Sequence, residues 1–249
     1  MKAVLVATFL ASTLGFSGVT NPPTSEALME LKSTETKASK SKVKAKDGDY
    51  LVMLYKGTLK DGKQFDGNTM PDDVPFVFKL GQGKVIAGWD KGLVGMTKGS
   101  HRRLEIPSKM GYGEQSVGPI PANSDLYFDV ELLEVFSEAD YGKFTSKTEK
   151  AGTGRGAKDG DMISVHYTGT FLNGKKFDSS KDRNTPFTIT LGAKQVITGW
   201  DKGLVGIKTG EIRTLLIMPG AAYGKRGAGQ VIPSDMPIKF EVECLSISK

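Results

Sequence analysis

Residues 85–95 read Val-Ile-Ala-Gly-Trp-Asp-Lys-Gly-Leu-Val-Gly, and residues 196–206 read Val-Ile-Thr-Gly-Trp-Asp-Lys-Gly-Leu-Val-Gly. The tryptophan and the leucine of each stretch are four residues apart, so they share one face of a helix. The closing glycines, Gly95 and Gly206, stand where a helix readily ends, because glycine adopts the left-handed conformation without strain. We therefore expect one short helix in each copy, over residues 86–94 and 197–205.

The repeat continues on both sides of these stretches with a spacing of 111 or 112 residues. A period this long indicates duplicated domains rather than a solenoid of short repeats. The first copy gains one residue before Pro75 and loses one between Tyr112 and Pro121. The matched residues are mostly aromatic, apolar or acidic: Tyr55 and Tyr167, Phe65-Asp66 and Phe177-Asp178, Phe76 and Phe187, Tyr112 and Tyr223, Ile120 and Ile232, and Phe128 and Phe240.

Most of each copy has the pattern of β-strands. Asp-Gly and Asn-Gly dipeptides at residues 61–62 and 173–174 predict hairpin turns between apolar flanks. Apolar and charged residues alternate over 126–132 and 236–244, as in antiparallel strands with one buried face. Cys244 falls on the apolar side, which predicts a core side chain. The fold class is therefore α+β, with two tandem domains, each a curved antiparallel β-sheet wrapped on one short α-helix.

The N-terminus has the pattern of a signal peptide. Lys2 precedes a short apolar run and then small residues, whereas a membrane span needs about 20 apolar residues. We expect no membrane span and a secretory or extracellular protein, with a plastid reached through a two-part presequence as the alternative. The domain prediction is a signal peptide over 1–17, a flexible tether over 18–42, a first domain over 43–136, a linker over 137–144 and a second domain over 145–249.

Composition excludes several classes of function. The net charge of +6 is partly concentrated in residues 37–46, a pattern more typical of a solvated tether than of a nucleic-acid site. One cysteine cannot form an intramolecular disulfide or a cysteine-type zinc site, and with two histidines, His101 and His166, we expect no histidine-rich metal site. Neither histidine is matched in the other copy, so no duplicated Ser-His-Asp or Cys-His arrangement exists. We expect no metal, no cofactor and no nucleic-acid partner.

Four strings carry a family resemblance: Val-His-Tyr-Thr-Gly (165–169), Gly-Lys-Lys-Phe-Asp-Ser-Ser (174–180), Val-Ile-Thr-Gly-Trp (196–200) and Ala-Tyr-Gly (222–224). Together they resemble the FKBP-type peptidyl-prolyl cis-trans isomerases, the macrolide-binding immunophilins. The resemblance implies a half-open apolar pocket between sheet and helix that binds an Xaa-Pro segment. It also implies that Trp200 forms the floor, that Tyr223 and the Ile197 N–H bind substrate carbonyls, and that Asp178 organises Tyr167.

Carried over residue by residue, the resemblance implies two groups of site residues. The catalytic set is Asp178, Tyr167, Tyr223, Asp66, Tyr55 and Tyr112. The substrate-binding set is Phe177, Phe187, Val196, Ile197, Trp200, Val231, Ile232 and Phe240 in the second copy, with Phe65, Phe76, Val85, Ile86, Trp89, Ile120 and Phe128 in the first.

The resemblance implies isomerisation of Xaa-Pro bonds during protein folding without covalent chemistry, by a monomer acting on proline-containing clients and open to macrolide inhibitors. The second copy is expected to be the more active, because Gly67 of the first replaces Ser179 and the loops near the pocket differ in length. The alternative is a non-catalytic, chaperone-like module that binds proline-containing clients through the same pocket.

Overall fold

The structure is a computed structural model and describes residues 30–249. Backbone contacts divide the described residues into two compact units, the first comprising residues 30–69 with Phe78–Val135 and the second Met70–Val77 with Phe136–Lys249. The predicted signal peptide lies outside the described residues and stays a prediction. No helix within residues 30–249 is long and apolar enough to cross a membrane.

The first unit contains a six-stranded antiparallel sheet with the order β1-β5-β6-β2-β3, and β4 also pairs with β2. The side chains of β2 are almost all buried, which makes this strand the centre of the core. The elements are β1 (Lys32–Lys37), β2 (Tyr50–Thr58), β3 (Gln64–Gly67), β4 (Phe76–Lys79), α1 (Ala87–Gly92), β5 (His101–Ile106), the 3-10 turn Ser108–Met110 and β6 (Leu126–Phe136).

The second unit repeats this plan. Its sheet has the order β10-β8-β12-β11-β7, with β9 also paired to β8. The elements are the 3-10 turn Glu138–Asp140, β7 (Phe144–Lys150), β8 (Met162–Thr170), β9 (Lys176–Ser179), β10 (Phe187–Thr190), α2 (Thr198–Gly203), β11 (Ile212–Ile217), the 3-10 turns Pro219–Ala221 and Gly224–Arg226, and β12 (Ile238–Ser248).

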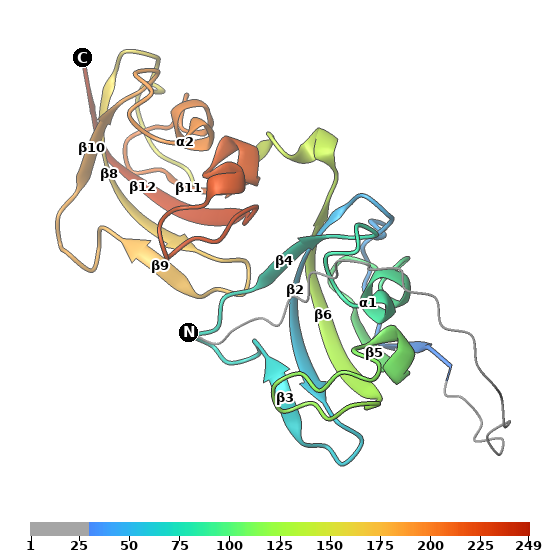
Figure 1. The fold of residues 1–249 in the computed structure, drawn as a ribbon. Helices are drawn as coiled ribbons and strands as arrows, with labels where there is room; N and C mark the ends of the chain where they lie inside the picture. Colours follow the sequence, from blue (N-terminus) through green and yellow to red (C-terminus); the bar gives the residue numbers. More distant parts are fainter. Residues whose placement is uncertain (1–29) are drawn as a thin grey trace, which may run out of the picture. The chain divides into compact units, whose positions relative to one another are not determined.

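One short helix lies against one face of the sheet in each unit (Figure 1). Both helices are shorter than expected, at six residues each. Glycine on the inner face allows the close approach: a Cβ at Gly88 would lie 2.3 Å from Ile106, and a Cβ at Gly199 would lie 2.5 Å from Ile217. The predicted α+β class is confirmed, with two antiparallel sheets and one helix on each.

The alternation predicted for the last strands is present. On β12, Ile238, Phe240 and Val242 are buried and the charged residues between them face outward. Cys244 is fully buried, as predicted for a core side chain, and burial raises the pKa of its thiol. A buried thiol with a raised pKa is a poor nucleophile, so this cysteine serves packing.

The prediction of a flexible tether over 18–42 is wrong for residues 32–37. They form β1, which pairs antiparallel with β5 from Lys32 opposite Glu105 to Lys37 opposite His101. All six side chains of β1 are exposed, so composition correctly indicated that nothing there is buried. An edge strand is held by backbone hydrogen bonds, which composition does not report. The Ser33 hydroxyl adds a 2.8 Å hydrogen bond to the carbonyl of Gly92.

The stretch predicted as a linker has structure of its own. Ser137 and Asp140 form a capping box that opens the 3-10 turn Glu138–Asp140. The first strand of the second sheet, β7, then starts at Phe144. The predicted linker, 137–144, is therefore one turn that leads directly into a strand.

Candidate functional site

The second unit contains a cluster of aromatic rings between its sheet and its helix. Tyr167 on β8 lies 5.2 Å from the ring of Trp200 on α2, and Trp200 lies 5.1 Å from Phe240 on β12. Phe177 on β9 meets Phe240 at 5.6 Å, and Phe187 on β10 meets Tyr167 at 5.9 Å. All four pairs are edge-to-face, the arrangement that aromatic quadrupoles favour.

Gly169 makes this packing possible. It follows Tyr167 by two positions on β8, so it points toward the same face of the sheet. A Cβ at this position would lie 2.6 Å from Phe177 and 2.7 Å from Phe240. Gly57 has the equivalent place in the first unit, where a Cβ would lie 2.8 Å from both Phe65 and Phe128. The two glycines therefore leave room for the rings.

The aromatic cluster borders an open cavity of about 470 Å³. Nine residues of the predicted set line it, and Gln195, which the sequence analysis did not include, is the tenth. Val231 and Ile232 do not line it: Val231 is 54% exposed and Ile232 is buried. The lining residues are Tyr167, Phe177, Asp178, Phe187, Gln195, Val196, Ile197, Trp200, Tyr223 and Phe240.

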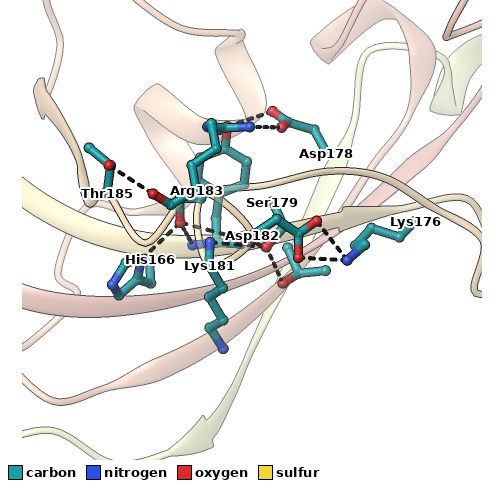
Figure 2. Close-up of polar contacts among 11 residues, drawn as sticks. His166, Lys176, Asp178, Ser179, Lys181, Asp182, Arg183 and Thr185 are labelled. Carbon is teal, nitrogen blue, oxygen red and sulfur yellow. Dashed lines mark hydrogen bonds and ion pairs between the residues drawn. The ribbon is translucent and has the colours of Figure 1, made fainter.

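A polar network occupies one wall of this cavity. The hydroxyl of Tyr167 donates a 2.5 Å hydrogen bond to Asp178 Oδ2, and Arg183 donates from Nη1 to Asp178 Oδ1 at 2.6 Å. Arg183 also donates from Nη2 to the Tyr167 hydroxyl at 2.9 Å. Figure 2 shows the guanidinium of Arg183 facing the carboxylate of Asp178. The three side chains hold one another in place.

The network sets the protonation state of its members. Burial raises the pKa of Asp178, but hydrogen bonds from Arg183 and Tyr167 outweigh it, so the pKa of this carboxyl lies below its usual value. Burial, followed by the hydrogen bond to Asp178, raises the pKa of Tyr167. Burial also raises the pKa of Tyr223 across the cavity. At neutral pH Asp178 is therefore ionised and both tyrosines carry their protons.

The sequence repeat does not reveal Arg183, because only residues shared by the two copies stand out in it. Residues 67–75 of the first copy contain no lysine or arginine, so Arg183 has no counterpart there. The available signal was the difference: a cation five residues beyond Asp178 in one copy alone. Gln195 was missed for a similar reason, since Lys84 takes its place in the first copy.

Neither histidine lies in the cavity lining. His166 points from β8 to Ser180, with Nδ1 3.0 Å from the Ser180 hydroxyl oxygen. That oxygen also accepts a 2.8 Å hydrogen bond from the backbone N–H of Tyr167. In the first unit, Asn68 Oδ1 accepts from the N–H of Tyr55 at 2.7 Å. Different side chains thus anchor the same backbone position beside each pocket tyrosine.

The first unit assembles the matching rings. Trp89 on α1 lies 5.0 Å from Tyr55 and 5.1 Å from Phe128, and Phe65 lies 5.6 Å from Phe128. Phe78 on β4 adds a ring 5.8 Å from Trp89, at a position where the second unit has Ile189.

The remaining predicted residues of the first unit differ in exposure. Ile120 is buried, whereas Phe76, Val85 and Ile86 are half-buried. Tyr112 is half-buried as well, and burial followed by the charge of Asp66 raises its pKa. The unit therefore presents the tyrosine in its protonated form at neutral pH.

The acidic residue of the first unit has different partners. Asp66 Oδ2 accepts a 2.8 Å hydrogen bond from the hydroxyl of Tyr55, as in the second unit. Its other oxygen accepts a 2.8 Å hydrogen bond from the backbone N–H of Gly67 instead of from an arginine. Within residues 30–249, Asp66 forms no ion pair. The tyrosine–aspartate pair is shared, and the cation belongs to the second unit alone.

Neither unit groups side chains for a metal ion. Over the part of the chain that the structure describes, no three His, Cys, Asp or Glu residues come together as potential ligands. The site thus offers apolar walls, hydrogen-bond donors and one carboxylate. Such groups can bind and orient an uncharged segment.

Comparison with protein families identifies both units. A family model described as FKBP-type peptidyl-prolyl cis-trans isomerase matches residues 41–133 and 153–245, which together make up most of the chain. The chain belongs to the FKBP-type peptidyl-prolyl cis-trans isomerase family. Each match covers the strands and the helix that border the aromatic cluster of that unit.

Several relatives in this family are longer than this chain. The human peptidyl-prolyl cis-trans isomerase FKBP10 is 36% identical over 201 residues, which cover 80% of this chain and 34% of that protein. Human FKBP9 is 37% identical over 203 residues, covering 81% and 35%. The FK506-binding protein 2B of Rhizopus delemar is 58% identical over 94 residues, covering 37% and 45%. The chain thus spans about a third of the length of its long relatives.

A solved structure containing the three FKBP domains of wheat FKBP73 is also similar. It is 24% identical, with a TM-score of 0.41, and the match covers 88% of this chain and 95% of that one.

Proposed function

We propose that the protein accelerates cis-trans isomerisation of Xaa-Pro bonds by binding the proline at the aromatic cluster of each unit. The cavity of the second unit carries the proposal, because aromatic and aliphatic side chains make up most of its lining. Rotation about the bond faces a barrier of roughly 18–20 kcal/mol, which resonance in the planar amide creates. The twisted amide has lost this resonance and is less polar than the planar one. An apolar cavity therefore favours the twisted form relative to water.

Trp200 is suited to form the floor of the cavity beneath the proline ring. It is 3% exposed and lies between Tyr167 and Phe240, so its position is determined by packing on two sides. A rigid floor matters because binding accelerates rotation only if the twisted geometry is held better than the planar one.

Two donors border the cavity and can hold the substrate backbone. The N–H of Ile197, just before α2, and the hydroxyl of Tyr223 donate no hydrogen bond to any residue in the range 30–249. Both residues line the cavity. The two groups can therefore bind carbonyl oxygens on either side of the proline. Because the chain is held on both sides, rotation is confined to the Xaa-Pro bond between the two contacts.

Asp178 acts beside the rotating bond. Its carboxylate keeps the Tyr167 hydroxyl oriented through the 2.5 Å hydrogen bond, and Arg183 keeps the carboxylate oriented in turn. No proton needs to move and no bond needs to form, so a fixed and ionised carboxylate suffices. We propose that the second unit is the more active, because the equivalent Asp66 lacks this cationic clamp.

Separate Asp66→Val and Asp178→Val variants of the full chain test the proposal. We expect the wild type to isomerise a Leu-Pro tetrapeptide, each variant to lose part of that activity, and Asp178→Val to lose the larger part. The double variant should retain little. A wild type without turnover would contradict the enzymatic function and favour a module that only binds its clients. Equal losses in the two single variants would contradict the ranking of the units.

A further inference from the structure

The charges around the two aromatic clusters differ in sign, although the clusters share most of their rings. Each unit has one exposed lysine on the segment before its helix, Lys84 before α1 and Lys194 before α2, although Lys84 occupies the position of Gln195, one residue further along. This segment therefore contributes one positive charge to each unit. Any difference between the units must come from the other sides of the clusters.

The first difference lies beside the acidic residue. In the second unit Arg183 offsets the charge of Asp178 through its 2.6 Å ion pair. In the first unit Asp66 forms no ion pair with any residue that the structure describes. The residues that follow it within the first unit, Gly67 to Thr69, add no cation. The charge beside the acidic residue is therefore close to neutral in the second unit and negative in the first.

The second difference follows the cavity tyrosine. Tyr223 leads directly into the 3-10 turn Gly224–Arg226, so Lys225 and Arg226 follow the cavity-lining tyrosine by two and three residues, and both are exposed. Neither forms an ion pair within residues 30–249. Gly227 ends the turn at a φ of +64°, and a Cβ there would lie 2.3 Å from the backbone oxygen of Ile232, so only glycine fits at this position.

The first unit has an acidic residue in this place. Gly113 and the exposed Glu114 follow Tyr112, and the turn contains no lysine or arginine up to Pro121. The charge of Glu114 therefore adds to that of Asp66, while Lys225 and Arg226 add to an already neutralised Asp178. Two separate segments thus make the surroundings of the first cluster more negative and those of the second cluster more positive.

We propose that the two units select prolines by the charge of the flanking residues, the first favouring basic neighbours and the second acidic ones. This selectivity rests on the proposed isomerase function and names its substrate classes. A chain with both units would thereby handle prolines in clients of either charge, which a duplicated pair with identical surrounding charges would not.

The expected effect is moderate because these charges are exposed. In water, a unit charge several ångströms from a substrate charge changes binding by about twofold, and two or three charges combine to about fivefold. Such an effect weakens as salt rises, since the screening length falls from about 10 Å at 0.1 M to about 3 Å at 1 M. Salt dependence therefore separates charge selection from differences in pocket shape.

The test uses the full chain in two backgrounds, Asp178→Val to report the first unit and Asp66→Val to report the second, with the double variant as baseline. Substrates are acetylated Ala-Xaa-Pro-Phe peptides with Lys, Leu or Glu before the proline. We expect kcat/KM to favour Lys over Glu by about fivefold in the Asp178→Val background, and Glu over Lys by about as much in the Asp66→Val background. Both preferences should shrink toward unity in 1 M salt.

Charge reversal at Lys225 and Arg226 provides the decisive comparison. In the Asp66→Val background, Lys225→Glu with Arg226→Gln should reverse the preference for Glu while turnover of the Leu peptide changes little. Lys150→Glu on β7 is the matched control, because it changes charge away from the cavity lining and should leave the ratio unchanged. Equal use of Lys and Glu peptides by active variants, or ratios unaffected by salt, would overturn the proposal. Absence of turnover with all three peptides would overturn the isomerase function itself.

Discussion

The two units keep the same rings and differ in the polar groups around them. Trp89 and Trp200 each meet a tyrosine and a phenylalanine at nearly the same distances, between 5.0 and 5.2 Å. In contrast, Asp178 has a guanidinium partner that Asp66 lacks. Ring packing determines the shape of the pocket, so it tolerates little change, whereas the exposed charges around it can vary without disturbing the fold. The two copies therefore share their ring packing and differ in the charges around it.

The largest expected effect comes from removing a phenylalanine ring that both clusters share. Phe128→Ala and Phe240→Ala each remove a buried ring that contacts the tryptophan of its unit. We expect each variant to destabilise its own unit by about 3–5 kcal/mol, because the lost contacts leave a cavity. Denaturant unfolding followed by tryptophan fluorescence measures this, since each unit contains one of the two tryptophans.

Leucine at the same positions is the matched control, because it refills part of the volume. A smaller loss is expected for Phe128→Leu and Phe240→Leu than for the alanine variants. If one alanine variant left the stability of its unit unchanged, the two ring clusters would not be equivalent supports of the fold.

A second comparison concerns the arginine that closes each helix. Arg102 Nη1 donates to the carbonyls of Gly92 and Val94 at 2.8 and 3.0 Å, and Arg213 makes the same pair of bonds in its unit. Only Arg213 also bonds a buried carboxylate, with Nε 2.9 Å from Glu211 Oε1. In the first unit the Nε of Arg102 is buried without a partner in the described chain.

The consequence is an unequal cost of removing the two arginines. Arg213→Met leaves Glu211, which is 4% exposed, buried without its cation, and we expect a loss of about 3 kcal/mol. Arg102→Met removes the helix-closing bonds alone and should cost about 1 kcal/mol. Domain-resolved thermal or denaturant unfolding provides the measurement. Adding Glu211→Gln to Arg213→Met should recover part of the loss, and equal costs for the two arginines would contradict this account.

The smallest expected effect comes from removing the charge of Arg183, the cation that distinguishes the second site from the first. Hydrogen bonds from Arg183 and Tyr167 outweigh burial and hold the pKa of Asp178 below its usual value. The ionised carboxylate therefore stabilises the second unit above its unfolded pKa of about 3.9, and this contribution is lost as the pH falls through the lower folded pKa. In Arg183→Gln the pKa should rise, and acid unfolding of this unit should begin at a higher pH.

Carboxyl titration by NMR reports the pKa of Asp178 directly, with Lys225→Gln as a control that removes an exposed cation outside the network. At neutral pH the stability lost in Arg183→Gln should be about 0.5 kcal/mol, because the pair is exposed to solvent. An Asp178 pKa that stays unchanged in Arg183→Gln would show that the guanidinium does not control this carboxylate.

Predictions from the sequence were most accurate where a pattern repeats. Alternation predicted the buried face of β12, including Cys244, and the glycines at 95 and 206 follow the ends of the two helices. The prediction of a tether was wrong at Lys32–Lys37, because β1 buries no side chain and is held by its backbone. Val231 was expected in the pocket, but it is exposed and does not line the cavity.

The sequence by itself determined that the chain contains two copies of one α+β domain and which residue types the copies share. Periodicity and spacing carry this information because strands and helices impose it locally. Only the tertiary structure decided that Arg183 clamps Asp178 and that Gln195 joins the cavity, because such contacts depend on how loops fold back over the sheet. Loops have no period to reveal their path, so the side chains that distinguish the two pockets emerge only from their positions in space.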